Sequence, residues 1–294
     1  MTRPHRIQVA SIAEGSHTKI DLPPICNFVE AFVYGCPNGT IRTYEDSLDD
    51  PEMPLVIRGL GHKNQHIIKK AREDERLFYY IDTGYMGNNR KTKLYHRIVK
   101  NNVQNTEEII ERPIDRLNKI KYRAPKARIK GGENILVVPP SGKAMKFYDQ
   151  DIDIWLDKTI KQIQTRTDRP IIIRKKPVRH ERVKRVRNKW HLTIHEAFDD
   201  AWCIVTHNSI AAVEAIMYGK PAIALAPNNA AITICDTDLD NIENPYRPNR
   251  DEITAFAAHL SYCQFTFEEM KRGYAWRVLP VSYTHLTLPT INWV

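Results

Sequence analysis

Short apolar runs alternate with helical patterns along the chain, and this alternation constrains the fold more than any other feature. The run "PLVIRGLG" (54–61) is typical of a strand that ends in a glycine turn, and "NQHIIKKARED" (64–74) of the helix behind it. "RLFYYIDTG" (76–84) then predicts the next strand. Parallel neighbours need such a crossover connection, so the pattern indicates the α/β class with parallel sheets.

The same alternation restarts in the second half. "NILVVPPS" (134–141), "RPIIIRKKP" (169–177) and "WCIVTHNS" (202–209) predict buried strands. Between the first two lies an expected helix over 151–167. Its apolar positions expected on one face are Ile154, Leu156, Ile160 and Ile163.

Residues 113–133 are basic and contain Pro and Gly, which is typical of a linker or boundary. A chain of 294 residues is long enough for two domains of ordinary size. We therefore predict two Rossmann-like domains that face a cleft, with ligands bound outside the carboxyl ends of the strands. The expected units are an N-terminal α/β domain (1–120), a second α/β domain (131–250) and a helical segment (251–280).

The last residues are expected to be foreign to the protein. "VSYTHLTLPT" (281–290) resembles an in-frame translation of a transposon adapter used in shotgun sequencing. We therefore predict a non-native tail over 281–294 and an environmental origin for the sequence, and we leave the tail out of the fold, as with a cloning scar.

Composition excludes several classes of protein. No run of eighteen apolar residues is present, which argues against a membrane span, and the N-terminus resembles no secretory signal. The five cysteines are odd in number and lack CxxC spacing, so we expect a reducing, cytoplasmic location with no disulfide framework and no bound metal. "DTDLD" (236–240) has the spacing of a DxD metal motif, but we expect a solvated turn there.

The net charge of +9 is concentrated in one segment. Residues 174–190 hold nine Lys or Arg and one Glu, a net charge of +8. Such a patch favours a polyanionic partner, here double-stranded DNA, over the alternative of a solvated, mobile loop. The predicted DNA contacts are Arg179, Arg182, Lys184, Arg185, Arg187 and Lys189.

The stretch "THNSIAAVEAIMYGKPAIAL" (206–225) predicts a strand end, a turn, a helix and a further strand. The first amides of a helix lack intrahelical partners and favour anions, so Asn208 and Ser209 can cap the helix or donate to a phosphate. Glu214 is expected further inside the helix, where a buried carboxylate needs donors such as a ribose diol. The alternative is an ion pair between Glu214 and Lys220 or an Arg of the basic segment.

This stretch resembles the nucleotide-sugar motif of GT-B glycosyltransferases and related epimerases. The resemblance implies that Ser209 contacts a diphosphate and Glu214 a ribose, with a UDP-sugar, foremost UDP-glucose, as donor. "IIIRKKP" (171–177) resembles the Arg-x-x-Pro strand end of several GT-B families. The first glycine-rich element of many such enzymes is missing, since "VVPPSGKAM" (137–145) offers only Gly142. The donor-binding residues implied are Ser141, Arg174, Lys176, His207, Asn208, Ser209 and Glu214.

Two residues of the first half are candidates for the group that takes the proton from an acceptor hydroxyl. Asp82 stands at the expected carboxyl end of a strand, and His62 stands in a glycine turn. The alternatives are a cap for Asp82 and a plain turn histidine for His62.

Four segments resemble putative glycosyltransferases of tailed phages, some of which modify 5-hydroxymethyl pyrimidines in DNA: "NFVEAFVYG" (27–35), "PLVIRGLGHKNQHI" (54–67), "FYYIDTGYMGN" (78–88) and "YHRIVKNNVQ" (95–104). The function implied is transfer of a hexose from a UDP-sugar to 5-hydroxymethylcytosine, or another hydroxymethylpyrimidine, of phage DNA in the cytoplasm of a bacterial host. The alternatives are a glycan or capsule glycosyltransferase, a nucleotide-sugar epimerase, and a DNA-binding protein without catalysis.

Overall fold

The computed structural model describes most of the chain in eight stretches. Only the backbone is described at 8–9 and 62–63. The basic segment beyond residue 175 and the predicted tail lie outside the described residues. The described residues are 8–9, 28–36, 44, 48–88, 92–106, 108–125, 131–175 and 193–279.

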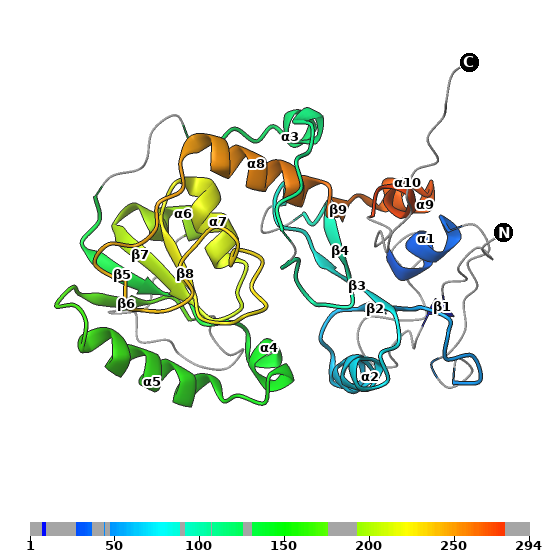
Figure 1. Ribbon diagram of the computed structural model, residues 1–294, viewed down its shortest axis with the longest axis horizontal. Helices are drawn as coiled ribbons and strands as arrows, with labels where there is room; N and C mark the ends of the chain where they lie inside the picture. Colours follow the sequence, from blue (N-terminus) through cyan, green and yellow to red (C-terminus); the bar gives the residue numbers. More distant parts are fainter. Residues whose placement is uncertain are drawn as a thin grey trace, which may run out of the picture.

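Two sheets, one in each half of the chain, lie side by side (Figure 1). The elements of the first half are β1 (Gln8–Val9), α1 (Phe28–Tyr34), β2 (Leu55–Arg58), α2 (His62–Glu73), β3 (Phe78–Thr83), β4 (His96–Lys100) and α3 (Asp115–Ile120).

The second half begins after residue 130 and carries the second sheet. Its elements are β5 (Asn134–Val137), α4 (Gly142–Phe147), α5 (Ile152–Gln164), β6 (Ile171–Ile173), α6 (Ile194–Asp199), β7 (Ala201–Thr206), α7 (Ala211–Tyr218) and β8 (Ala222–Ala224). The chain continues through α8 (Arg250–Ser261), β9 (Gln264–Phe265), α9 (Phe267–Lys271) and α10 (Tyr274–Val278).

The second sheet has the order β6-β5-β7-β8, and all of its pairs are parallel. Successive side chains of a strand point to opposite faces, and both faces are apolar. Ile135 and Val137 of β5 pack in the cluster that contains Leu156 of α5. Leu136 packs on the other face, in the cluster that contains Val213 of α7. Helices therefore cover both faces, as in a Rossmann-like unit.

The first sheet is also covered on both faces. Leu55 of β2 packs with Ile68 of α2, whereas Val56 packs with Phe32 of α1 on the opposite face. Its order is β1-β2-β3-β4-β9. The sequence indicated parallel sheets, and β1, β2 and β3 are parallel, but β4 is antiparallel to β3. The described residues between β3 and β4 contain no crossover helix, and an antiparallel pair does not need one.

The chain returns to the first sheet at its end. After α8, β9 pairs antiparallel with β4, and α9 packs against α1. Residues 264–279 thus lie with the first half although they follow the second in sequence (Figure 1). The predicted division into 1–120, 131–250 and 251–280 stays a prediction.

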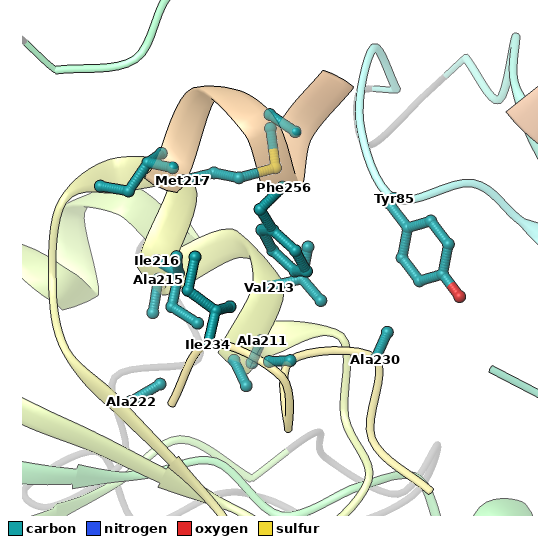
Figure 2. Packing of buried hydrophobic residues seen from close by; sticks show 14 of the residues in the cluster. Tyr85, Ala211, Val213, Ala215, Ile216, Met217, Ala222, Ala230, Ile234 and Phe256 are labelled. Atoms are coloured by element: carbon teal, nitrogen blue, oxygen red, sulfur yellow. The ribbon is translucent and has the colours of Figure 1, made fainter. Parts of the chain in front are cut away.

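The largest apolar cluster joins the two halves. It contains Val213 of α7 and Phe256 of α8 together with Tyr85 and Leu117 of the first half. Figure 2 shows Phe256 beside Val213 beneath α8, with Tyr85 on a loop of the first half. The two sheets are therefore connected through buried side chains as well as through the chain itself.

Two details of the helices differ from the sequence expectation. Of the predicted face of α5, Leu156 and Ile163 are buried, whereas Ile154 is 71% exposed. Trp155 and Thr159 are buried in addition, and Trp155, Thr159 and Ile163 follow an i, i+4, i+8 spacing. Part of the expected linker 113–133 forms α3, because buried Leu117 anchors it to the shared core. No helix among the described residues is long and apolar enough to span a membrane.

Candidate active site

The turn between β7 and α7, residues 207–210, is the centre of the candidate site. Helix α7 begins at Ala211, so Glu214 lies in its first turn rather than deeper inside as expected. The Ser209 Oγ accepts a hydrogen bond from the Ala211 amide at 3.2 Å, which confirms a capping contact although the formal cap position is Ile210. The helix ends at Gly219 in a left-handed conformation with φ of 91°, which glycine adopts without strain.

Three consecutive carbonyls of the β7–α7 turn accept hydrogen bonds from side-chain amides. Asn229 Nδ2 donates to His207 O at 3.1 Å and to Ser209 O at 3.0 Å. Gln104 Nε2 donates to the carbonyl between them, Asn208 O. Asn229 is itself held, because its Oδ1 accepts from the Ala231 amide at 3.0 Å. The direction of all three peptide planes is therefore fixed from one side.

The amides of the same three planes have no partner in the described part of the chain. In a trans peptide the N–H points away from the carbonyl of the preceding residue. Fixing the three carbonyls thus turns the N–H groups of Asn208, Ser209 and Ile210 the opposite way, and none of them donates to another described residue. Consecutive free amides at a helix start bind anions, because donors and helix dipole act together.

Glu214 is partly buried near this turn. Burial raises the pKa of its carboxyl from 4.5 to about 7, while the charges of Arg174 and Lys93 act in the opposite direction. Arg174 follows β6, and Lys93 comes from the first half. Among the described residues, no side chain donates a hydrogen bond to this carboxylate. Glu214 thus has the capacity to accept two hydrogen bonds from a ligand.

Lys220 is not the partner of Glu214. Its side chain is 1% exposed, and its Nζ donates to the carbonyls of Gly131, Asp199 and Ala201 at 3.1, 2.9 and 3.0 Å. An ammonium has three donors, and here all three are used. The alternative of a Glu214–Lys220 ion pair is therefore wrong: Lys220 ties the start of the second half to β7.

Further polar atoms without partners gather beside the turn. His207 and Asn208 are 7% and 5% exposed, yet His207 Nδ1 and Asn208 Oδ1 have no hydrogen-bond partner among the described residues. The same holds for Tyr148 Oη and Asn228 Oδ1. Burial raises the pKa of Tyr148, and the nearby amides of Asn208 and Asn228 lower it, although neither contact has hydrogen-bonding geometry. Buried polar groups normally find partners, so these atoms indicate a ligand site.

Tyr148 and Asn228 were missed by the sequence analysis. The Tyr148 ring lies 5.9 Å from that of His207, and Asn228 follows β8 at a strand end. Tyr148 ends the short helix α4 as its C-cap. An isolated tyrosine carries no spacing signal, but the strand-end position of Asn228, in "APNN", matched that of His207 and Asn208.

Asp82 of β3 is surrounded by donors of its own half. Its Oδ2 accepts from Tyr80 Oη at 2.8 Å and pairs with Arg97 Nη2 at 3.3 Å. Its Oδ1 accepts from the Thr83 amide at 2.7 Å. The Asp82 side chain is nevertheless 38% exposed, so part of the carboxylate faces outward. Its role as the base stays a prediction.

The Asp82 cluster lies near the β7–α7 turn, where the halves meet. The charge of Arg97 acts on Tyr148, which in turn lies beside Asn208. Gln104, from the loop after β4, bonds directly to the turn. The strand ends that the sequence assigned to donor and acceptor sides are therefore neighbours.

The remaining predicted residues are placed as follows. Ser141 caps α4, with its Oγ accepting from the Ala144 amide at 3.3 Å. His62 is the first residue of α2 rather than part of the turn, because the helix starts directly after Gly61. The predicted contacts outside the described residues are Lys176, Arg179, Arg182, Lys184, Arg185, Arg187 and Lys189.

The acidic run 236–240 is engaged with protein groups. Asp236 accepts from the Tyr246 amide at 2.6 Å, and Asp240 pairs with Arg166 at 3.1 Å. No cluster of His, Cys, Asp and Glu among the described residues is arranged to hold a metal ion. These contacts agree with the turn expected for "DTDLD".

Comparison with known proteins identifies the fold. The structure resembles KpsC of Thermosulfurimonas dismutans, a beta Kdo 2,4 transferase, with a TM-score of 0.50 at 12% identity over 88% of this chain and 91% of that chain. A second KpsC structure from this organism, a beta Kdo 2,7 transferase, gives a TM-score of 0.47 at 14% identity over 93% and 99%. No family model and no curated protein matches the sequence. The predicted α/β fold with two Rossmann-like halves is confirmed.

Proposed function

We propose that this protein is a GT-B glycosyltransferase that moves a sugar from a nucleotide-sugar donor to a glycan acceptor of the capsule type. The observation that carries the proposal is the β7–α7 turn, where three amides and a carboxylate lie at the carboxyl end of a parallel sheet, all without a hydrogen-bond partner among the described residues. Phosphates and a ribose are the groups that this combination recognises.

In the proposed binding mode, the amides of Asn208, Ser209 and Ile210 hold the donor phosphates. Arg174 adds positive charge from the end of β6, close enough to act on Glu214. Glu214 accepts from the ribose hydroxyls, which requires its ionised form. Because burial raises the pKa of Glu214 to about 7, donor binding is expected to weaken below neutral pH.

The acceptor enters from the first half, where Asp82 takes the proton of the attacking hydroxyl. Such a group must come within hydrogen-bond reach of that hydroxyl, and the proposal is supported by the exposure of the Asp82 side chain, which is 38%. The similar fold of a Kdo transferase makes a Kdo-containing glycan the first acceptor to test. Transfer to hydroxymethylated DNA, suggested by the basic segment, is the second candidate.

The deciding experiment offers donors and acceptors in combination. The full chain is incubated with UDP-glucose, other UDP-hexoses or CMP-Kdo, together with a Kdo-terminated oligosaccharide or hydroxymethylcytosine DNA. Mass spectrometry then reads the acceptors. A glycan that gains one sugar supports the proposal. A gain on DNA alone supports the second candidate, and conversion of the donor into an isomeric nucleotide sugar, with no acceptor modified, indicates an epimerase.

A further inference from the structure

One side chain of the first half reaches into the β7–α7 turn of the second. Gln104 lies in the loop after β4 and is 5% exposed. Its Nε2 donates to Asn208 O, and its Oε1 accepts from the Ala230 amide at 3.1 Å. Both polar ends of this amide are therefore used on the second half.

The backbone on either side of Gln104 is anchored to the first half. Val103 O accepts from Arg97 Nε at 3.2 Å, and the Val103 amide donates to Asn102 Oδ1 at 2.8 Å. On the other side, the Asn105 amide donates to Tyr85 Oη at 2.9 Å. Gln104 thus links a stretch of backbone held by the first half to the turn of the second half.

The bond from Gln104 controls one amide of the predicted phosphate site. Asn229, from the second half itself, fixes the planes that contain His207 O and Ser209 O. The middle plane contains Asn208 O and the N–H of Ser209, and Gln104 holds its carbonyl. Because carbonyl and N–H point in opposite directions across a trans peptide, this bond sets the direction of the Ser209 N–H.

We propose that Gln104 is a positioning residue that orients the Ser209 amide toward the donor phosphates, so that the donor site is complete only when the two halves are docked. This role rests on the proposed function. Without Gln104 the middle plane is free to rotate, and the Ser209 N–H no longer converges with the amides of Asn208 and Ile210.

The test compares two glutamines that both bridge the halves. Gln104→Met keeps the length of the side chain and removes both hydrogen bonds. The matched control is Gln65→Met, because Gln65 Nε2 donates across the halves to Lys143 O at 3.0 Å and to no carbonyl of the turn. Calorimetry measures the Kd of UDP and CMP, and of uridine and cytidine, which lack phosphate.

Whichever of UDP and CMP binds the wild-type protein, Gln104→Met is expected to raise its Kd by roughly 10- to 100-fold. This is the effect of one misaligned charge-assisted hydrogen bond. Nucleoside binding should stay within about twofold, since the ribose contact with Glu214 is separate. Gln65→Met should change neither. Gln104→Glu keeps the acceptor for the Ala230 amide, but it places a carboxylate oxygen next to Asn208 O, where two acceptors repel each other. This variant should therefore bind nucleotide at least as weakly as Gln104→Met.

Two outcomes overturn the role of Gln104 and leave the proposed function in place. These are unchanged nucleotide binding by Gln104→Met, and equal losses for nucleotide and nucleoside, which would show a general effect on the fold. If wild-type protein binds neither UDP nor CMP, the proposed function fails first and the role of Gln104 fails with it. Amide hydrogen exchange adds a check, because Ala230 should exchange faster in Gln104→Met than in Gln65→Met.

Discussion

Two strand ends meet where the halves join, and they differ in how their hydrogen bonds are used. At the end of β3, both carboxylate oxygens of Asp82 accept from Tyr80, Thr83 or Arg97 of the same half. At the end of β7, the carbonyls are occupied, but three amides are left without a described partner. The first arrangement satisfies most of its own hydrogen bonds, whereas the second offers three donors to a ligand. Ligand affinity is therefore expected to come from the second half.

The largest expected effect tests whether the end of β3 has a role beyond structure. Asp82→Asn keeps the size of the side chain and removes its basicity. If Asp82 is the base, turnover should fall by roughly 10²–10⁴-fold with little change in the KM of the donor. Steady-state kinetics on the acceptor found in the transfer assay measures both.

Asp149→Asn is the matched control for this substitution, because Asp149 makes an exposed ion pair with Lys69 between the halves. It should leave turnover within about twofold, as exposed pairs contribute little. If Asp82→Asn has a lower melting temperature but unchanged turnover, Asp82 is not the base, and its role is structural, through the ion pair with Arg97.

The next largest effect concerns the stability that the buried Lys220 side chain provides. Lys220 is fully satisfied by three carbonyls, so Lys220→Met should lower the free energy of unfolding by roughly 3 to 5 kcal/mol. Lys158→Met, at an exposed site on α5, should change it by less than about 0.5 kcal/mol. Urea unfolding compares them, and equal midpoints would mean that the three bonds do not stabilise the fold.

For Glu214, removal of the charge should raise the free energy of unfolding, whereas for Lys220 it should lower it. Its folded pKa of about 7 lies above the ordinary 4.5, so ionisation costs stability as pH rises between these values. Glu214→Gln should therefore raise the free energy of unfolding by up to about 3 kcal/mol at pH 8 and leave it unchanged at pH 4. Unfolding curves at the two pH values measure this, and a gain of equal size at both would exclude ionisation as its cause.

The same substitution should weaken nucleotide binding at pH 8. The neutral amide replaces one carboxylate oxygen by an NH2 donor, and it removes the charge that strengthens the ribose hydrogen bonds. Wild-type affinity should fall as pH drops from 8 to 6, and the variant should lose this dependence. The charged Glu214 would then lower the stability of the protein and raise its affinity for nucleotide. Such a trade-off is expected of residues that serve function.

The smallest expected effect concerns the basic segment. Replacing Arg182, Lys184, Arg185 and Arg187 with Gln should leave the affinity for UDP or CMP within about twofold, because none of the four belongs to the proposed nucleotide site of free amides and Glu214. The salt dependence of binding to labelled duplex DNA should become shallower if the segment contacts DNA phosphates. Identical slopes for wild type and variant would remove the DNA candidate.

Much of the fold was predictable because the relevant signals are local. The apolar runs at β2, β3, β5 and β7 and the helix at α5 follow periodicities that burial imposes. The pairing of β9 with β4 was not predictable, because Gln264–Phe265 is too short to show alternation and its partner lies far away in sequence. The position of α3 likewise depends on tertiary burial of Leu117 inside a basic stretch.

The candidate site was predictable only where a motif was present. The stretch 206–225 pointed to Ser209 and Glu214 because a strand end and a helix start occur together. Gln104 and Tyr148 are single polar residues in loops or at short helix ends, and the fold alone brings them to the turn. The three hydrogen bonds from Lys220 to backbone carbonyls could not be predicted either, because the fold brings these carbonyls together and the sequence carries no pattern for them.

The pairing of β9 with β4 has a consequence for synthesis on the ribosome. The first half emerges first, yet the outer edge of β4 stays open until the residues of β9 have left the exit tunnel, after the whole second half has been made. An open strand edge is a site where a nascent chain pairs with other chains. In a cell, the half that is translated first therefore completes its sheet last, and during that interval it depends on the brevity of β4 or on chaperones for protection.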